Sequence, residues 1–298
     1  MGPFTTTIDL RLADKLLQGL RNQDFEISKP DHTIFSAKKK GVVCTLYQSG
    51  KLVVQGKEMK EFIEFYLEPE ILGTFNFTNP LVNLDTKARI GIDESGKGDF
   101  FGPLCIAGVF VKPEQFAELH EMGVKDSKAL TDKSIIKIAN QIKSKCQHHI
   151  VKINPPKYNQ IYADFKNLNT LLAWGHATTI ENLVERTGCT NVIIDQFANE
   201  RVVETALKRK KMNIELTQRH RGEEELPVAA ASILARQAFV EGLEKLGHDL
   251  GIVLPKGSGS LTLQIGKEVL KKFGIATLLS ICKQHFKTLD AILGKIRE

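Results

Sequence analysis

Long apolar runs are missing from this 298-residue sequence: no stretch reaches eighteen uninterrupted apolar residues, so no membrane-spanning helix is expected. The first residues lack the basic start and apolar core of a secretory signal. Cysteines number only five, are scattered and include no Cys-x-x-Cys pair, which argues against a disulfide framework or a zinc site. These absences predict a protein of the reducing cytoplasm. Disorder is also excluded, because 42% of the residues are apolar and 26% are charged.

Positive charge is unevenly distributed along the chain. Residues 1–85 carry 10 Lys/Arg and 11 Asp/Glu, whereas the remainder carries 31 and 24. A basic stripe is typical of a protein that binds a polyanion, although a solvated helix face gives the same pattern. The densest run contains Arg201, Lys208, Arg209, Lys210, Lys211, Arg219 and Arg221.

The first part of the chain predicts a small α+β domain over residues 1–72. Apolar residues at helical spacing predict a helix over 5–22. Alternating runs over 32–56, broken by Lys-Gly and Ser-Gly, predict strands joined by hairpin turns. A second helix is expected over 57–67, ended by Pro69.

Residues 73–88 have no helical period and are predicted to be a linker. After them, two consecutive apolar strands are followed by alternating helices and strands. This order predicts an α/β domain over residues 89–298, a mixed sheet flanked by helices. The expected strands are 88–95, 103–111, 149–156, 190–197 and 212–218, and the expected helices are 131–145 (N-capped by Thr131), 168–186, 199–211 and 227–246.

Acidic residues follow the predicted strands. The segment "GIDESGKGDFFGP" places Asp93 and Glu94 at one strand end, and Asp195 ends another. Strand neighbours point to opposite faces, but bending at a strand end can bring both to one edge. Acids from separate strands converge at one edge of an α/β sheet. Three consecutive glutamates, 223 to 225, precede the last predicted helix, where the helix dipole also favours acids.

Clustered carboxylates without a Cys/His group suit Mg²⁺ or Mn²⁺. Close carboxylates repel one another unless a cation neutralises them. Two such cations about 3.5–4 Å apart can activate a water and hold the leaving oxygen in phosphodiester hydrolysis. Taken alone, the adjacent Asp93 and Glu94 favour an ordinary turn acid and surface acid.

The glycines that follow the acids do not form a dinucleotide fingerprint. Gly96, Gly98 and Gly102 have the wrong spacing, and the residues after Pro103 predict a strand instead of a helix. Glycine-rich backbone can still bring N–H groups close to a phosphate or a sugar hydroxyl, and Lys97 could neutralise a phosphate.

Four ordered motifs resemble those of the type 2 ribonuclease H family: "IGIDESGKGDFFGP", "VKDSKAL", "VIIDQF" and "ELPVAAASILAR". The form of the glycine loop, the "DQF" and the glutamate before the last helix resemble the ribonuclease HIII branch. The segments "LVVQGKE" and "EFYLEPEILG" are similar to the N-terminal domain of that branch, which resembles TATA-box-binding protein. The resemblance implies an RNase H-like catalytic domain preceded by a substrate-binding domain.

The resemblance also implies a site of four carboxylates that binds Mg²⁺ or Mn²⁺, two ions per site. Asp93, Glu94 and Asp195 match the first three acids. Family spacing before Pro227 selects Glu223 as the fourth, with Glu224 as the alternative because the run of glutamates leaves the register open. Substrate contacts are implied for Gly96, Lys97, Gly98, Ser127 and Lys128.

The implied activity is hydrolysis of the RNA strand of RNA–DNA hybrids, leaving 3′-hydroxyl and 5′-phosphate ends. The enzyme is expected to be a cytoplasmic monomer with no protein partner, which reads the shape of the hybrid and the 2′-hydroxyl. Two alternatives stay open: a non-catalytic nucleic-acid-binding module and another RNase H-fold nuclease acting on DNA. The acids argue against the first, and the glycine and Asp-Ser-Lys loops against the second.

A docking surface for the hybrid is expected on the N-terminal domain. Lys38, Lys39 and Lys40 cluster on a predicted hairpin with Phe35 and Tyr47 nearby. Basic residues beside aromatics form a plausible nucleic-acid surface, although a solvated turn with core aromatics gives the same pattern.

Overall fold

The computed structural model describes residues 2–74, 77, 85–125, 127, 130–195, 200–210, 212–219 and 222–294. The chain divides into two compact units, Met1–Asp85 and Thr86–Glu298. Their boundary falls within the segment 73–88 that we expect to be a linker. Residues 75–76 and 78–84 of that segment lie outside the described part of the chain.

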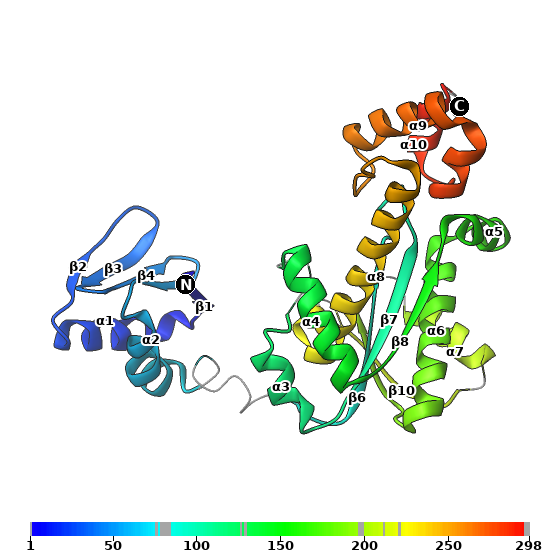
Figure 1. The fold of residues 1–298 in the computed structure, drawn as a ribbon. Coiled ribbons are helices and arrows are strands. Elements are labelled where there is room, and N and C mark those ends of the chain that lie inside the picture. The colour runs from blue at the N-terminus through cyan, green and yellow to red at the C-terminus, as the bar shows by residue number, and fades with distance from the viewer. Residues whose placement is uncertain are drawn as a thin grey trace. The chain divides into compact units, whose positions relative to one another are not determined.

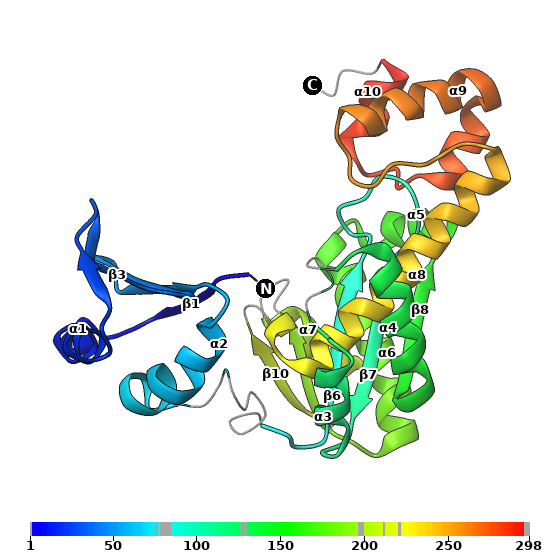
Figure 2. The ribbon, with the colours of Figure 1, turned by 60° about the vertical axis from the view of Figure 1, so that its left-hand side comes forward.

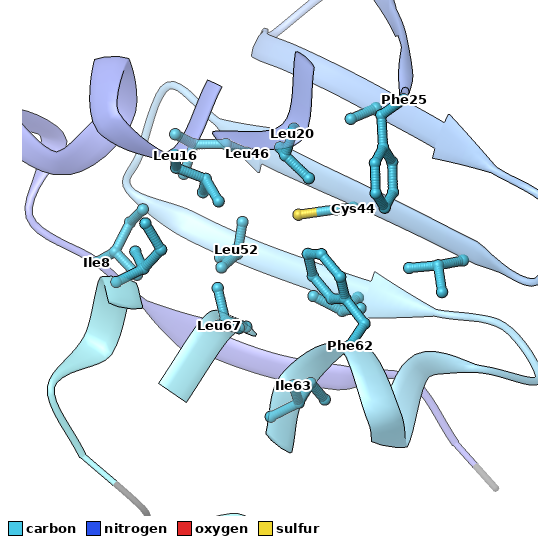
Figure 3. Close-up of a cluster of buried hydrophobic side chains, with 14 of the residues drawn as sticks. Ile8, Leu16, Leu20, Phe25, Cys44, Leu46, Leu52, Phe62, Ile63 and Leu67 are labelled. Atoms are coloured by element: carbon cyan, nitrogen blue, oxygen red, sulfur yellow. The ribbon is translucent and has the colours of Figure 1, made fainter. Parts of the chain in front are cut away.

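The first unit is built on an antiparallel sheet with the strand order β1-β5-β4-β3-β2. Burial alternates along β3 and β4, because successive side chains of a strand point to opposite faces. The buried face packs against the helices, and Figure 3 shows Leu52 between Leu16 and Leu20 on one side and Phe62 and Leu67 on the other. The elements are β1 (Phe4–Thr7), a 3₁₀ turn (Leu10–Leu12), α1 (Ala13–Asn22), β2 (Glu26–Ser28), β3 (Thr33–Lys39), β4 (Val42–Tyr47), β5 (Lys51–Gln55), α2 (Met59–Phe62) and a π-helix (Ile63–Leu72).

Two predictions for this unit are wrong in their boundaries. The predicted helix over 5–22 begins only at Ala13, because the three threonines before it form β1 and pair with β5. The predicted second helix does not stop at Pro69. With the wider winding of a π-helix, in which hydrogen bonds join residues five apart, the chain continues past this proline to Leu72.

The hairpin predictions are confirmed. Gly41 and Gly50 have φ angles of +84° and +82°, which suit the predicted Lys-Gly and Ser-Gly turns. The lysines at 38–40 are exposed, but Phe35 is only 1% exposed and belongs to the core. Of the two aromatic residues expected beside the lysines, Tyr47 alone is exposed.

The second unit contains the predicted mixed sheet, with strand order β10-β9-β6-β7-β8. Strands β6, β7 and β8 are antiparallel neighbours, whereas β9 and β10 run parallel to β6. All five predicted strands of this unit are present, as β6 (Arg89–Ser95), β7 (Leu104–Val111), β8 (Gln147–Ile153), β9 (Asn191–Asp195) and β10 (Glu215–Arg219).

Helices cover both faces of this sheet (Figures 1 and 2). One face packs against α6 and α7, sharing a core with Ile92 and Ile106, and the other lies against α8. Thr131 caps α4 as predicted, accepting a hydrogen bond from the Ser134 N–H. The helices are α3 (Gln115–Glu121), α4 (Asp132–Lys145), α5 (Pro155–Phe165), α6 (Leu168–Thr187), α7 (Glu200–Arg209), a 3₁₀ turn η4 (Gly222–Glu224), α8 (Leu226–Leu250), α9 (Ser260–Ile281, kinked at Gly274) and α10 (Lys287–Leu293).

Helix α8 lies unusually close to the sheet. A Cβ atom on Gly91 of β6 would lie 2.1 Å from the carbonyl carbon of Pro227. The small residues Ala229, Ala230 and Ala231 are also buried in this contact. Within the described chain, α8 is the one helix long and apolar enough to cross a membrane, and its apolar window is 89% buried in the fold.

We expect Gly91→Ala to destabilise the protein by about 1–3 kcal/mol or more, because backbone faces backbone and neither side can yield. Gly98→Ala is the matched control, since nothing lies within 4 Å of a Cβ there. The measurement is thermal unfolding of both variants. Equal melting temperatures would show that α8 can move away from the sheet without cost.

Candidate functional site

Two of the predicted carboxylates stand where strands β6 and β9 separate. The parallel ladder pairs Ile92 with Ile194 and ends there, so Asp93 and Asp195 are the next residues of their strands. Residues in register point to the same face, which here is the face covered by α8. The structure thus brings together two acids that lie about a hundred residues apart in the sequence.

Glu94 lies on the opposite face of β6 from Asp93. Strand β6 stays regularly paired with β7 through Ser95, so no bend brings the adjacent acids to one edge. The Glu94 carboxylate points toward α6, where its Oε2 lies 3.0 Å from His176 Nε2. Its Oε1 accepts a hydrogen bond from Lys97 Nζ at 2.6 Å. The two acids therefore flank the strand end.

The charges in this carboxylate cluster, Asp93, Glu94 and Asp195, act on one another. Burial, followed by the charges of Glu94 and Asp195, raises the pKa of Asp93 well above its ordinary value. Burial opposes ionisation of Glu94 too, but His176 and Lys97 outweigh it and lower the pKa of Glu94 to about 2. Burial would lower the pKa of Lys97, but the three carboxylates raise it. The Lys97 ammonium is thus attracted to the whole cluster.

A pair of serines supports Asp93 from α8. Ser232 donates a hydrogen bond to the Asp93 carboxylate, and its hydroxyl lies 2.6 Å from that of Ser127. Ser127, which we predict to contact the substrate, is 8% exposed and sits behind Asp93. Its predicted neighbour in substrate contact, Lys128, lies outside the described residues.

Asp195 is held by the turn that carries the three glutamates. The Gly222 N–H donates to Asp195 Oδ1 at 2.9 Å, and a Cβ at 222 would lie 2.8 Å from the Asp195 Cα. Only glycine allows this approach. Glu223 follows directly in η4, although its side chain lies outside the described part of the structure.

The other two glutamates of the run have different surroundings. Glu225 forms ion pairs with the buried Arg89, at 3.7 Å, and with Arg219. Glu224 is exposed. The ion pairs give Glu225 a structural role at the start of α8, which leaves Glu223 and Glu224 as candidates for the fourth acid.

The glycine loop, residues 96–103, contains glycines of two kinds. Gly96 has φ +93°, and a Cβ there would lie 2.3 Å from the Pro103 carbonyl oxygen and 2.9 Å from the Phe239 ring. Gly98 has nothing within 4 Å of its Cβ position. Lys97 between them is 47% exposed. Gly96 therefore serves the fold, whereas Gly98 presents its backbone to open space.

The donor set of the site fits a hard divalent cation. Asp93 and Asp195 offer oxygens on one face, and their mutual repulsion is what a cation would relieve. Among the described side chains, no three carboxylate, imidazole or thiol groups already lie close enough together to hold a metal ion. Each Glu94 oxygen already has a partner, Oε1 with Lys97 and Oε2 with His176, so a cation at Glu94 would share these oxygens with them.

Three residues of the site have no signal in the sequence. His176 is fully buried within α6, and a single histidine in a helix gives no sign of a carboxylate partner 82 residues away. Ser232 lies in a run of small residues that predicts only close packing. Gly222 precedes the glutamates without a recognisable motif.

Comparison with known proteins places the chain among characterised groups. A family model described as ribonuclease HII matches residues 90–289, and one described as a domain of unknown function (DUF3378) matches residues 7–77. The chain is 66% identical over 294 residues to the ribonuclease HIII of Protochlamydia amoebophila (strain UWE25), covering 99% of this chain and 98% of that one.

Two further comparisons agree. The chain is 47% identical over 293 residues to the ribonuclease HIII of Chlamydia felis (strain Fe/C-56), with 97% of each chain covered. Its fold is similar to the crystal structure of Bst-RNase HIII in complex with Mn²⁺, with a TM-score of 0.69, 27% identity and 98% of each chain covered.

Proposed function

The chain belongs to the ribonuclease HII family, among its ribonuclease HIII members, and from this premise we propose how its residues act on RNA–DNA hybrids. The enzyme degrades the RNA of such hybrids. Membership decides against both alternatives, the non-catalytic module and the DNA nuclease. The observation that carries the site assignment is the position of Asp93 and Asp195, each directly after the last residue pair of the β6–β9 ladder, where the charge of Asp195 helps to raise the pKa of Asp93.

In this proposal Asp93, Glu94, Asp195 and Glu223 form the catalytic site and hold divalent metal. Enzymes of this class are metal-dependent, and the related Bst-RNase HIII has been solved with Mn²⁺. Two Mg²⁺ or Mn²⁺ ions, when bound, supply activation of water and stabilisation of the leaving oxygen. The chain's own contribution is to orient the acids and, through His176 and Lys97, to favour the ionised form of Glu94.

Each neighbour of the acids has a definite task in that arrangement. Ser232 orients Asp93, Gly222 orients Asp195, and His176 holds one Glu94 oxygen away from the substrate side. Lys97 balances the cluster and, half exposed, can turn its ammonium to a backbone phosphate of the hybrid. Cleavage on this plan leaves 3′-hydroxyl and 5′-phosphate ends.

Substrate contact is proposed for the exposed part of the glycine loop. The open position of Gly98 lets backbone N–H groups approach the ribose, where the 2′-hydroxyl distinguishes RNA from DNA. Gly96 supports this approach from within the fold. The loop that contains Ser127 and Lys128 is proposed to contact a backbone phosphate near the site, and the buried Ser127 hydroxyl connects that loop to Ser232.

The first unit is proposed to be a clamp for the hybrid. The exposed lysines 38–40 surround a groove with Lys57, although Asp24 and Glu26 also line it. A second binding site on the same chain raises the effective concentration of substrate without altering the chemistry. We also expect a monomer in the cytoplasm, in keeping with five free cysteines, of which four are buried.

The first prediction concerns the acids. Asp93→Asn and Asp195→Asn should fold and bind hybrid but lose cleavage by orders of magnitude, because each removes a carboxylate from the paired face. Cleavage of labelled hybrid and binding by fluorescence anisotropy provide the measurement. Near wild-type rates in either variant, with metal present, would refute the assignment.

The same assay fixes the fourth acid. Glu223→Gln should reduce cleavage far more than Glu224→Gln, since only Glu223 directly follows the glycine bonded to Asp195. Glu225→Gln should instead lower the melting temperature, because it disturbs the ion pair with buried Arg89. If Glu224→Gln were the inactive variant, the register would be displaced by one residue.

The glycine loop gives a second prediction with a built-in control. Gly98→Val should retain the wild-type melting temperature and its metal binding by calorimetry, yet lose most cleavage, because the new side chain occupies the substrate's space. Gly96→Val should instead unfold at lower temperature, because its side chain collides with Pro103 and Phe239. Unchanged turnover in Gly98→Val would contradict ribose contact at this position.

The clamp is tested in the full chain by changing Lys38, Lys39 and Lys40 to alanine. KM for hybrid should rise while kcat falls much less, and the slope of log K against log salt should become shallower by roughly 0.9 for each phosphate that the variant no longer neutralises. Replacing the exposed Lys29, Lys51 and Lys60 removes the same charge from the same unit and serves as the control. Equal salt slopes in the two triple variants would argue against a clamp at this hairpin.

A further inference from the structure

A lysine is fully buried beneath the glycine loop. Lys283 follows the end of α9 and is 0% exposed. Its ammonium donates hydrogen bonds to the carbonyl oxygens of Asp99, at 2.8 Å, and Gly102, at 2.7 Å. It also lies 5.7 Å from the centre of the Tyr158 ring. Burial lowers the pKa of Lys283 to about 8, which shows how costly a charge is at this depth.

Main-chain bonds join the same two segments. The Lys283 N–H donates to the Phe100 carbonyl at 2.9 Å, and the Gly102 N–H donates to the Ile281 carbonyl at 3.1 Å. Phe101 pairs with Cys282 as an isolated β-bridge. Residues 99–102, the second half of the glycine loop, are therefore bonded to residues 281–283 as a short strand would be.

A second segment holds this half of the loop from the other side. The Gly257 N–H donates to Asp99 Oδ1 at 2.6 Å, and the Phe100 N–H donates to the Gly257 carbonyl at 3.0 Å. Asp99 thus carries one bond from Gly257 on its side chain and one from Lys283 on its carbonyl. Two parts of the chain more than 150 residues downstream fix one short loop.

Apart from the ion pair of Lys97 with Glu94, the described contacts hold the first half of the loop near its ends. Strand β6 fixes it at Ser95, and the Asp99 N–H donates to the Gly96 carbonyl at 3.3 Å. Between these points Lys97 is half exposed and Gly98 faces open space. The placement of both residues therefore depends on where Asp99 is anchored.

We propose that Lys283 is a positioning residue that fixes the glycine loop so that Lys97 and Gly98 meet the ribose-phosphate backbone of the hybrid. The inference rests on the proposed role of those two residues in substrate contact. An ammonium suits the task because charge-assisted bonds are about twice as strong as neutral ones, and one group can hold two carbonyls at once. A neutral apolar residue would fill the space without fixing the loop.

The test is Lys283→Met in the full chain, since methionine has a similar length and no donor. KM for hybrid should rise about tenfold, whereas kcat should change less than about threefold, because the carboxylates themselves stay in place. Loss of folded enzyme alone gives the opposite pattern, a lower apparent kcat at unchanged KM. Lys145→Met, which removes a half-exposed lysine paired with Glu118, is the control and should change neither constant.

A second variant releases the same half of the loop at a less buried point. Asp99→Ala loses the bond from Gly257 and should also raise KM. Because both changes free one loop, the double variant should raise KM by less than the product of the single effects. If Lys283→Met does not fold, Lys283→Gln takes its place, because Asp99→Ala leaves the bond from Lys283 to the Asp99 carbonyl intact.

A wild-type KM in folded Lys283→Met, or in Lys283→Gln if the first variant does not fold, would overturn the inference. If the proposed substrate contact at Gly98 is wrong, Gly98→Val will cleave hybrid normally. This result distinguishes an error in the substrate contact from an error in the role of Lys283. An inactive wild-type enzyme on hybrid would refute the proposed function itself.

Discussion

The close contact between α8 and strand β6 is the constraint on which the site depends. The helix runs alongside the strand, and each step of the contact has a consequence. Pro227 meets Gly91 where no side chain fits, Ser232 then reaches Asp93, and Phe239 packs against Gly96 beyond the strand end. Glycine is needed at position 91, where the two backbones touch. This close contact between α8 and β6 also places Ser232 within reach of Asp93. If α8 were displaced by a few ångströms, the hydrogen bond from Ser232 to Asp93 would be lost.

Electrostatics in the site follow from this geometry and from strand alternation. Asp93 and Asp195 share one face and repel each other, whereas Glu94 on the other face is stabilised as an anion by His176 and Lys97. The adjacent acids in the sequence are therefore not equivalent. A cation would stabilise the ionised form of Asp93, whereas the charge of Glu94 is already balanced by His176 and Lys97.

The sequence was sufficient for the sheet and for the proximity of Asp93 and Asp195, because both follow from local rules, but not for the position of Glu94 on the opposite face of β6. Apolar strands ending in acids predict convergence at one edge, and β6 and β9 confirm it. Predictions from local sequence were wrong where contacts with distant residues determine the secondary structure. Residues 4–7 form a strand because β5 offers a partner, and the chain passes Pro69 in a π-helix. His176 was invisible because its partner comes from another element.

The residues of the glycine loop form one sequence motif, but they have different structural roles and depend on distant parts of the chain. Its residues match one family pattern, yet Gly96 is required by packing and Gly98 faces outward. The second half of the loop forms hydrogen bonds to residues around 257 and 282. A motif near residue 100 is therefore completed by residues near the end of the chain. On the proposed substrate contact, the position of this short segment depends on long-range anchoring, in which the Lys283 ammonium holds two loop carbonyls at once.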